Sequence, residues 1–239
     1  MRTVVVTGGG TGIGREIAAQ FATEGCHVVI TGRRADVLQK AVDEIGGSVR
    51  AVTMDGTDPE QTADAAREIG PVDVLVNNAG GNTDFDRDEP RTLREVADAW
   101  RLNVESNVMT AVLMTTALLP AMPSGSAVIT IGSIAADKGA GSYGAAKAAV
   151  ASWNVDLARR IGDRGITANI VSPGYIADTE FFRDKLTDDR KHALIDAAMT
   201  RRAGAPSDIA ATVRFLASPG ARQITGQAIA VNGGEWTTR

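Results

Sequence analysis

Short apolar segments rich in β-branched residues alternate with longer amphipathic segments along most of the chain. The apolar segments predict seven strands, at 3–6, 27–31, 49–54, 72–76, 127–131, 167–171 and 224–231. The segments with helical periodicity or capping residues predict helices, at 15–24, 35–45, from 58 or 59 onward, 92–119, 143–161 and 207–217. This alternation predicts a parallel sheet with helices on both faces and right-handed crossovers.

Nearly every predicted strand is followed by a turn that carries polar or small residues. In a parallel α/β sheet, ligands bind beyond the carboxyl ends of the strands, where the strand order reverses. The turns that meet this condition lie at 8–14, 33, 55, 77–80, 133 and 173–174. We therefore expect them to converge on one rim and to form one site.

The first of these turns, TGGGTGIG at 7–14, stands between a predicted strand and a predicted helix. Glycines let the backbone approach a pyrophosphate closely, and a helix N-terminus offers unpaired N–H groups and a positive dipole end. The spacing of Gly8, Gly12 and Gly14 differs from the G-x-G-x-x-G fingerprint, and a plain tight turn is the alternative.

The second predicted strand ends in Gly32, Arg33 and Arg34 and carries no acidic residue there. An acid at this position binds the ribose of NAD, whereas an arginine accommodates the 2′-phosphate of NADP. The pair therefore predicts NADP(H), with NAD(H) as the alternative cofactor and a solvated loop as the structural alternative. Asp55 ends the third strand and could accept a hydrogen bond from adenine, while Asp58 or Pro59 could begin the next helix.

We expect proton transfer at this rim to depend on three residues: Ser133, Tyr143 and Lys147. Tyr143 and Lys147 are four residues apart in a predicted helix, so the two side chains lie on one face. A free tyrosine has a pKa of about 10, and a neighbouring cation favours the phenolate and lowers that pKa. The Ser133 hydroxyl could hold a substrate oxygen beside the phenol, so the group could transfer a proton to or from that oxygen.

Two further segments have unusual composition. Asn103 lies inside an apolar helical stretch, where asparagine is unfavourable, and it predicts either a local irregularity or a functional hydrogen bond. Residues 177–202 form a charged, partly amphipathic insert that we interpret as a helical substrate cover, with an ordinary pair of surface helices as the alternative. For Asn77 a structural role is at least as plausible as ligand contact.

Composition limits the other classes of function. The chain has 239 residues, which fits one domain over 1–239, and its formal net charge of -4 argues against nucleic acid as a partner. Its single cysteine, Cys26, is expected to be a buried inert thiol, and no zinc motif is present. No span of about 20 apolar residues stands out, so no membrane partner is expected. Met1 leads almost directly into the first strand, which predicts a cytoplasmic protein without a signal peptide.

Taken together, these motifs resemble the short-chain dehydrogenase/reductase family over essentially the whole chain. The motifs that carry the resemblance are TGGGTGIG at 7–14, Asp55, NNAG at 77–80, Asn103, Ser133, YGAAK at 143–147, SPGYI at 172–176 and ITGQAIAVNGG at 224–234. The resemblance implies a Rossmann-type doubly wound domain and a catalytic tetrad of Asn103, Ser133, Tyr143 and Lys147. It implies cofactor contacts from Gly8, Thr11, Gly12, Ile13, Gly14, Arg33, Arg34, Asp55, Gly56, Asn78, Ala79, Gly80, Tyr143, Lys147, Pro173, Gly174, Ile176 and Thr179. It also implies a homotetramer or homodimer that uses the helices near 92–119 and 143–161.

The chain departs from the family pattern in two places. Only ten residues lead from Ser133 to Tyr143, where many members have a longer loop. The stretch after Pro173–Gly174 reads YIADTEFF, one residue longer before Thr179 than the usual PGxxxT pattern.

The resemblance implies an NADP(H)-dependent ketoreductase that interconverts a carbonyl and a secondary alcohol by hydride transfer. Members similar to 3-oxoacyl-(acyl carrier protein) reductases make a 3-oxoacyl thioester or another ketone the expected small-molecule substrate. A basic docking patch would favour the carrier-bound substrate, and Arg183, Arg201 and Arg202 are candidates for it. The alternatives are an alcohol or steroid dehydrogenase that works in the oxidising direction, and a catalytically silent cofactor-binding regulator.

Overall fold

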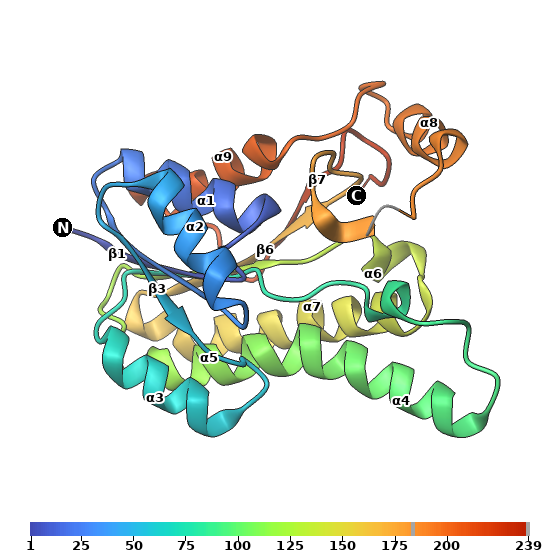
Figure 1. Cartoon of the computed structure of the whole chain (residues 1–239). Helices are drawn as coiled ribbons and strands as arrows, with labels where there is room; N and C mark the ends of the chain where they lie inside the picture. Colours follow the sequence, from blue (N-terminus) through green and yellow to red (C-terminus); the bar gives the residue numbers. More distant parts are fainter. Residues whose placement is uncertain (183–184, 238–239) are drawn as a thin grey trace.

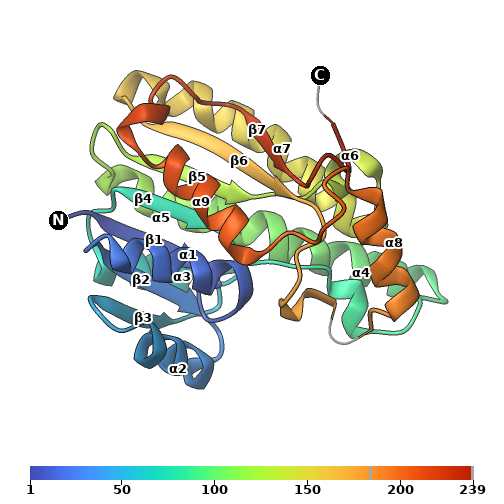
Figure 2. The same ribbon diagram turned by 90° about the horizontal axis from the view of Figure 1, so that it is seen from above.

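Seven parallel strands form one sheet in the computed structural model, which describes residues 1–182 and 185–237 (Figure 1). The strands are β1 (Thr3–Thr7), β2 (His27–Gly32), β3 (Val49–Thr53), β4 (Val74–Asn77), β5 (Ala127–Ile131), β6 (Thr167–Pro173) and β7 (Ala228–Val231). They are arranged in the order β3-β2-β1-β4-β5-β6-β7 (Figure 2). The order reverses between β1 and β4, which confirms the predicted doubly wound sheet and places its switch point there.

Helices cover both faces of this sheet (Figure 1). One face carries α1 (Gly12–Thr23), α2 (Ala35–Ile45) and α9 (Pro206–Leu216). The other carries α3 (Pro59–Ile69), α4 (Leu93–Val104), α5 (Thr110–Leu118) and α7 (Gly141–Ile161). Two further helices, α6 (Ala135–Lys138) and α8 (Asp188–Ala197), lie beyond the carboxyl ends of the strands.

The side chains of each strand alternate between two cores. In β1, Val4 and Val6 join the core under α1 with Phe21. Val5, between them, joins the opposite core with Met114 and other residues. This period of two explains why continuous apolar runs predicted the strands well, since both faces of a parallel sheet are buried. Three strand boundaries differ by two residues or more: β4 begins at 74 instead of 72, β6 ends at 173 instead of 171, and β7 begins at 228 instead of 224.

The predicted helix at 92–119 is interrupted by a π-helical turn, Glu105–Met109, between α4 and α5. The whole stretch Leu93–Ala121 is long and apolar enough to cross a membrane by length and composition alone. This finding corrects the expectation that no such span exists. A buried core helix passes the same test, and Met114 and Leu118 of α5 pack into the core with residues of the sheet, so the stretch is weak evidence for a membrane segment.

Candidate active site

A groove of about 670 Å³ runs along the carboxyl ends of the strands. Its walls come from the turns after β1 to β6 and from the segment after β6, as the convergence of those turns predicts. Every predicted site residue except Asn103 lines this groove. The part of the chain that the structure describes contains no group of three or more His, Cys, Asp or Glu side chains that could hold a metal ion.

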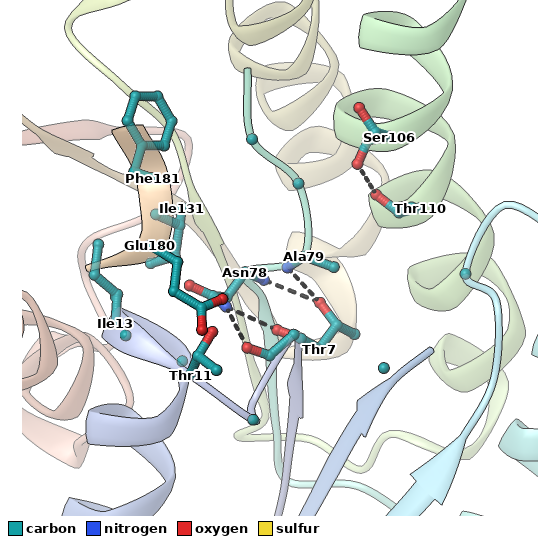
Figure 3. A pocket seen from close by; sticks show the side chains of 18 of the residues that line it. Thr7, Thr11, Ile13, Asn78, Ala79, Ser106, Thr110, Ile131, Glu180 and Phe181 are labelled. Carbon is teal, nitrogen blue, oxygen red and sulfur yellow. Dashed lines mark hydrogen bonds between the residues drawn. The ribbon is translucent and has the colours of Figure 1, made fainter. Parts of the chain in front are cut away.

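Thr7 and Asn78 hold the glycine-rich turn in place (Figure 3). The Thr7 hydroxyl oxygen accepts hydrogen bonds from the backbone N–H groups of Asn78 and Ala79, both at 3.0 Å. The Asn78 side-chain amide donates to the carbonyl oxygens of Thr7 and Gly8 at 2.9 and 3.1 Å. The turn after β1 is thereby fixed to the loop after β4. Asn77, in contrast, is buried and donates to Thr115 at 2.8 Å, which gives it a structural role.

This turn has the local structure that a dinucleotide pyrophosphate requires. A Cβ atom on Gly14 would lie 2.3 Å from the Gly8 carbonyl oxygen and 2.4 Å from the Asn78 amide nitrogen, so the turn closes only around glycine. Gly8 and Gly12 have φ angles of +64° and +52°, which other residues rarely adopt. Helix α1 begins here with no side-chain cap and no acidic residue in its first turn. Its N–H groups and positive dipole end therefore suit a phosphate group.

Arg33, Arg34 and Asp55 lie at the other end of the cofactor side of the groove. Asp55 accepts hydrogen bonds from the Thr57 N–H at 2.9 Å and the Thr57 hydroxyl at 2.8 Å. The first of these bonds is the main reason that the pKa of Asp55 is lowered, with a smaller contribution from Arg33. Asp58, not Asp55, caps α3, because it accepts from the backbone N–H groups that open that helix. Asp55 is therefore an ionised carboxylate within the groove.

Ser133, Tyr143 and Lys147 meet in the wall of the groove where β5 ends and α7 begins. The Lys147 ammonium donates to the Ile131 carbonyl oxygen at 2.9 Å and lies 5.9 Å from the centroid of the Tyr143 ring. Tyr143 also hydrogen-bonds with the Ser133 side chain. The connection between Ser133 and Tyr143 is short, but it still brings these two residues together. It consists of α6 and a turn in which Gly139 and Gly141 have positive φ angles.

Burial dominates the ionisation of this group. It raises the pKa of Tyr143 to about 12, although the hydrogen bond with Ser133 acts in the opposite direction. Burial also lowers the pKa of Lys147 to about 8. Both shifts disfavour the charged form, as expected for groups removed from water. The tyrosine pKa thus moves opposite to the direction predicted from its lysine neighbour, because desolvation outweighs the hydrogen bond with Ser133.

Asn103 is not among the residues that line the groove, and its catalytic role stays a prediction. The Asn103 side chain accepts from the Thr83 N–H at 3.1 Å and donates to Asp84 at 3.1 Å and to Ser142 at 2.8 Å. The side chain is fully buried, and both of its amide hydrogens and its oxygen have partners within the protein. The predicted local irregularity is present just after it, as the π-helical turn.

Asn107, which sequence analysis missed, supports the groove instead. Its side-chain oxygen accepts from the Gly81 N–H at 3.0 Å, and its amide donates to the Gly81 carbonyl oxygen at 2.9 Å. It thereby holds the loop that follows NNAG. Asn107 lies inside the π-helical turn. A second asparagine in the same apolar stretch was the available signal, but sequence periodicity could not show which loop residues each of the two side chains would bind.

The insert contributes the remaining wall through Thr179 and a short 3-10 turn, Glu180–Phe182 (η5). Asp178 adopts a left-handed φ of 56°, and with this bend Thr179 still lines the groove opposite Gly12 despite the additional residue before it. Helix α8 has no buried residue. Met199 is exposed, and residues 183–184 of the predicted insert lie outside the described residues.

Aromatic side chains gather where η5 meets the catalytic residues. Five of the seven Phe and Tyr residues of the chain form one cluster: Phe85, Tyr143, Tyr175, Phe181 and Phe182. The Phe181 ring lies 5.7 Å from the Tyr143 ring, centroid to centroid. Tyr143 is only 6% exposed, so the cluster covers the phenol.

Comparisons with known proteins agree with this architecture. A sequence model of the family described as enoyl-(acyl carrier protein) reductase matches residues 8–235. The 3-oxoacyl-(acyl-carrier-protein) reductase FabG of Escherichia coli (strain K12) is 36% identical over 242 residues, covering 98% of this chain and 96% of that protein.

Two solved structures are also similar over nearly their full length. A blue fluorescent protein from a metagenomic library, in complex with NADPH, has a TM-score of 0.86 and 35% identity, covering 99% of this chain and 98% of that chain. A 7α-hydroxysteroid dehydrogenase complexed with NADH and 7-oxo glycochenodeoxycholic acid has a TM-score of 0.89 and 33% identity, covering 98% and 93%. With these matches and the groove described above, the chain belongs to the short-chain dehydrogenase/reductase family and is an oxidoreductase.

Proposed function

We propose that this protein is an NADP(H)-dependent ketoreductase that interconverts a ketone and a secondary alcohol. The observation that carries the proposal is the placement of Ser133, Tyr143 and Lys147 in the same groove as the glycine-rich turn and Arg33. A proton donor, a phosphate-binding turn and a cation for a further phosphate thus belong to one continuous site. Solved relatives bind NADPH or NADH, which supports a nicotinamide cofactor here.

The bound cofactor supplies the hydride, and the chain supplies the proton and the alignment. The Tyr143 hydroxyl donates its proton to the oxygen of the substrate as negative charge develops there. The Ser133 hydroxyl holds that oxygen beside the phenol. The Lys147 ammonium, 5.9 Å from the centroid of the Tyr143 ring, would stabilise the phenolate as it forms, because a nearby cation favours the charged form. Asn107 has a positioning role, because it fixes the Gly81 backbone at the edge of the groove.

NADP(H) is the preferred cofactor in this proposal because two guanidinium groups follow β2 and no carboxylate does. Arg33 makes no ion pair with any residue in 1–182 or 185–237, and it lines the groove. It is therefore the residue that we assign to the 2′-phosphate. Pro173, Gly174, Ile176 and Thr179 would face the nicotinamide end, beside Ser133 and Tyr143.

A compact ketone fits the surroundings of the site better than a carrier-bound acyl chain. Arg202 forms a two-pronged ion pair with Asp208 at 2.7 and 3.0 Å, and Arg201 pairs with Asp196 at 3.6 Å. Each of these two candidates for a basic docking patch thus has an acidic partner that reduces the local positive charge, and Arg183 lies outside the described residues. The aromatic cluster beside Tyr143 also favours an apolar ring, and one relative is a hydroxysteroid dehydrogenase. An alcohol or steroid dehydrogenase is therefore the second candidate function.

The deciding experiment measures NADPH and NADH consumption separately with a short 3-oxoacyl thioester and with a bicyclic ketone. Turnover that prefers NADPH and the ring ketone is the expected result. Oxidation of a cyclic alcohol with no measurable ketone reduction would support the second candidate. Cofactor binding without turnover of any substrate would contradict both and would support a silent cofactor-binding regulator.

We also propose that the protein is cytoplasmic and assembles as a homotetramer or homodimer through the long helices. Exposed apolar side chains are concentrated on α4 and the π-helical turn after it: Leu93, Val96, Trp100, Leu102, Val104 and Met109. Val155, on the neighbouring helix α7, is also partly exposed. A patch of this kind is typical of a subunit interface. Light scattering coupled to gel filtration tests the assembly, and a monomer at micromolar concentration would contradict it.

A further inference from the structure

An acidic side chain from the insert lies in the part of the groove that suits phosphate. Glu180 is the first residue of η5, and its carboxylate accepts a hydrogen bond from the Arg34 guanidinium at 2.9 Å. The two residues are 146 positions apart in the sequence. Figure 3 shows the Glu180 side chain directed at Thr11, at the glycine-rich turn. Glu180 and Arg34 both line the groove.

In this contact, the Glu180 carboxylate binds Arg34 as a phosphate group of the cofactor could. Arg34 is one of the two cations after β2, where an arginine accommodates the 2′-phosphate of NADP. A carboxylate and a phosphate are recognised by the same donors, and arginine can bind either of them. The Arg34 and Glu180 side chains are 58% and 62% exposed, so the pair is easily broken by a stronger anion.

We propose that Glu180 determines cofactor preference by competing with the 2′-phosphate of NADP(H) for Arg34. NAD(H) lacks this phosphate, so Arg34 stays paired with Glu180 when NAD(H) is bound. Arg33 then remains the unpaired guanidinium after β2. With NADP(H), the phosphate binds Arg33 and draws Arg34 away from Glu180. The pair therefore moderates the preference for NADP(H) instead of abolishing NAD(H) use. This inference rests on the proposed function.

The competition has a consequence for access to the catalytic tyrosine. Glu180 and Phe181 are adjacent in one three-residue turn, and the Phe181 ring packs on the Tyr143 ring. When Arg34 releases Glu180, η5 loses its ion pair to the cofactor side of the groove. Because Phe181 packs on Tyr143, the loss of this ion pair removes one of the contacts that hold the turn against the catalytic residue.

Calorimetric titration of the purified protein with NADP⁺, NAD⁺ and 2′,5′-ADP tests the inference without requiring turnover. Glu180→Gln removes the competing charge and keeps the side-chain shape. It should tighten NADP⁺ and 2′,5′-ADP binding about two- to five-fold, the range expected for an exposed ion pair, and leave NAD⁺ binding within about 1.5-fold. In an Arg34→Ala background the same substitution should have no effect on NADP⁺ binding, because the group for which Glu180 competes is gone.

Glu24→Gln is the matched control, since Glu24 also pairs with an arginine, Arg214, but outside the groove. Thermal melting shows whether each variant folds. Equal changes for NADP⁺ and NAD⁺, or an effect of Glu180→Gln that persists without Arg34, would overturn the inference. Failure of the wild-type protein to bind either dinucleotide would instead overturn the proposed function, which keeps the two outcomes apart.

Discussion

The two walls of the groove are built in different ways. The wall on the glycine-rich turn is backbone held by partly buried hydrogen bonds between the ends of neighbouring strands, such as those of Thr7 and Asn78. The wall on η5 is a three-residue turn held by ring contacts and by one exposed ion pair to Arg34. A wall of the first kind can hold a cofactor without rearranging, whereas a wall of the second kind can move. We infer that the first serves binding and orientation, and that the second serves access and selection.

Tyr143→Phe should have the largest effect, because it removes the proton donor and leaves both walls intact. We expect turnover to fall by about 100- to 10,000-fold, the contribution of a positioned general acid, with cofactor affinity nearly unchanged. Steady-state kinetics and calorimetry check the two parts. Tyr175→Phe is the control, since Tyr175 contacts Phe182 but does not line the groove. Appreciable ketone reduction by Tyr143→Phe would show that the proton comes from another group.

Lys147→Met should change stability with a defined dependence on pH. Burial lowers the pKa of Lys147 from 10.5 to about 8, so the folded state binds fewer protons than the unfolded state between these values. Stability then rises with pH across that window, because the unfolded state is the one that binds more protons. The free energy of unfolding of the wild type, minus that of Lys147→Met, should increase by about 3 kcal/mol from pH 7 to pH 10.5.

Urea denaturation at several pH values measures this difference. Tyr143, whose pKa is raised to about 12, acts in the opposite direction only above its ordinary value of 10.0, and it is present in both proteins. Lys191→Met, which truncates an exposed lysine on α8, serves as the control. A difference that does not change between pH 7 and pH 10.5 would mean that Lys147 is not desolvated in the folded protein.

Gly14→Ala tests whether the wall on the glycine-rich turn is rigid. The added Cβ would meet the Gly8 carbonyl oxygen and the Asn78 amide, neither of which is the free end of a flexible chain. We expect a loss on the order of 1–3 kcal/mol in the free energy of unfolding, together with weakened cofactor binding. Gly162→Ala is the control, because a Cβ atom added there would have no neighbouring heavy atom within 4 Å. A Gly14→Ala protein as stable as the control would show that the turn can relax.

The wall on the glycine-rich turn could be predicted from the sequence, because the patterns that indicate it lie within short segments. Buried parallel strands appear as short apolar runs, and the glycine spacing places the turn directly after one of them. Gly14 and Asp55 therefore reach the groove as predicted. Asn103 is buried and does not line the groove, and the π-helical turn at Glu105–Met109 that follows it is an irregularity that no periodicity in the sequence encodes.

The wall on η5 could not be predicted from the sequence, because its contacts join distant parts of the chain. Arg34 pairs with Glu180 across 146 positions, and each residue alone is typical of a solvated loop. The direction of the Tyr143 pKa was wrong for a related reason. Sequence spacing shows the lysine on the same helix face, but it does not show that Tyr143 is buried and that the Phe181 ring packs against it.

Phe181→Ala should have the smallest effect, and it tests which of the two walls encloses the Tyr143 phenol. Removing the ring that packs on Tyr143 lets water reach the phenol, so the pKa of Tyr143 should fall from about 12 toward its ordinary value of 10.0. In a Tyr175→Phe background, Tyr143 is the only tyrosine left, and its phenolate absorbance can be followed as pH rises, with circular dichroism to confirm that the protein stays folded. Phe215→Ala, which truncates an exposed ring on α9, should leave the titration unchanged. If Phe181→Ala also leaves it unchanged, the phenol is enclosed by the rigid wall, and η5 cannot control access to it.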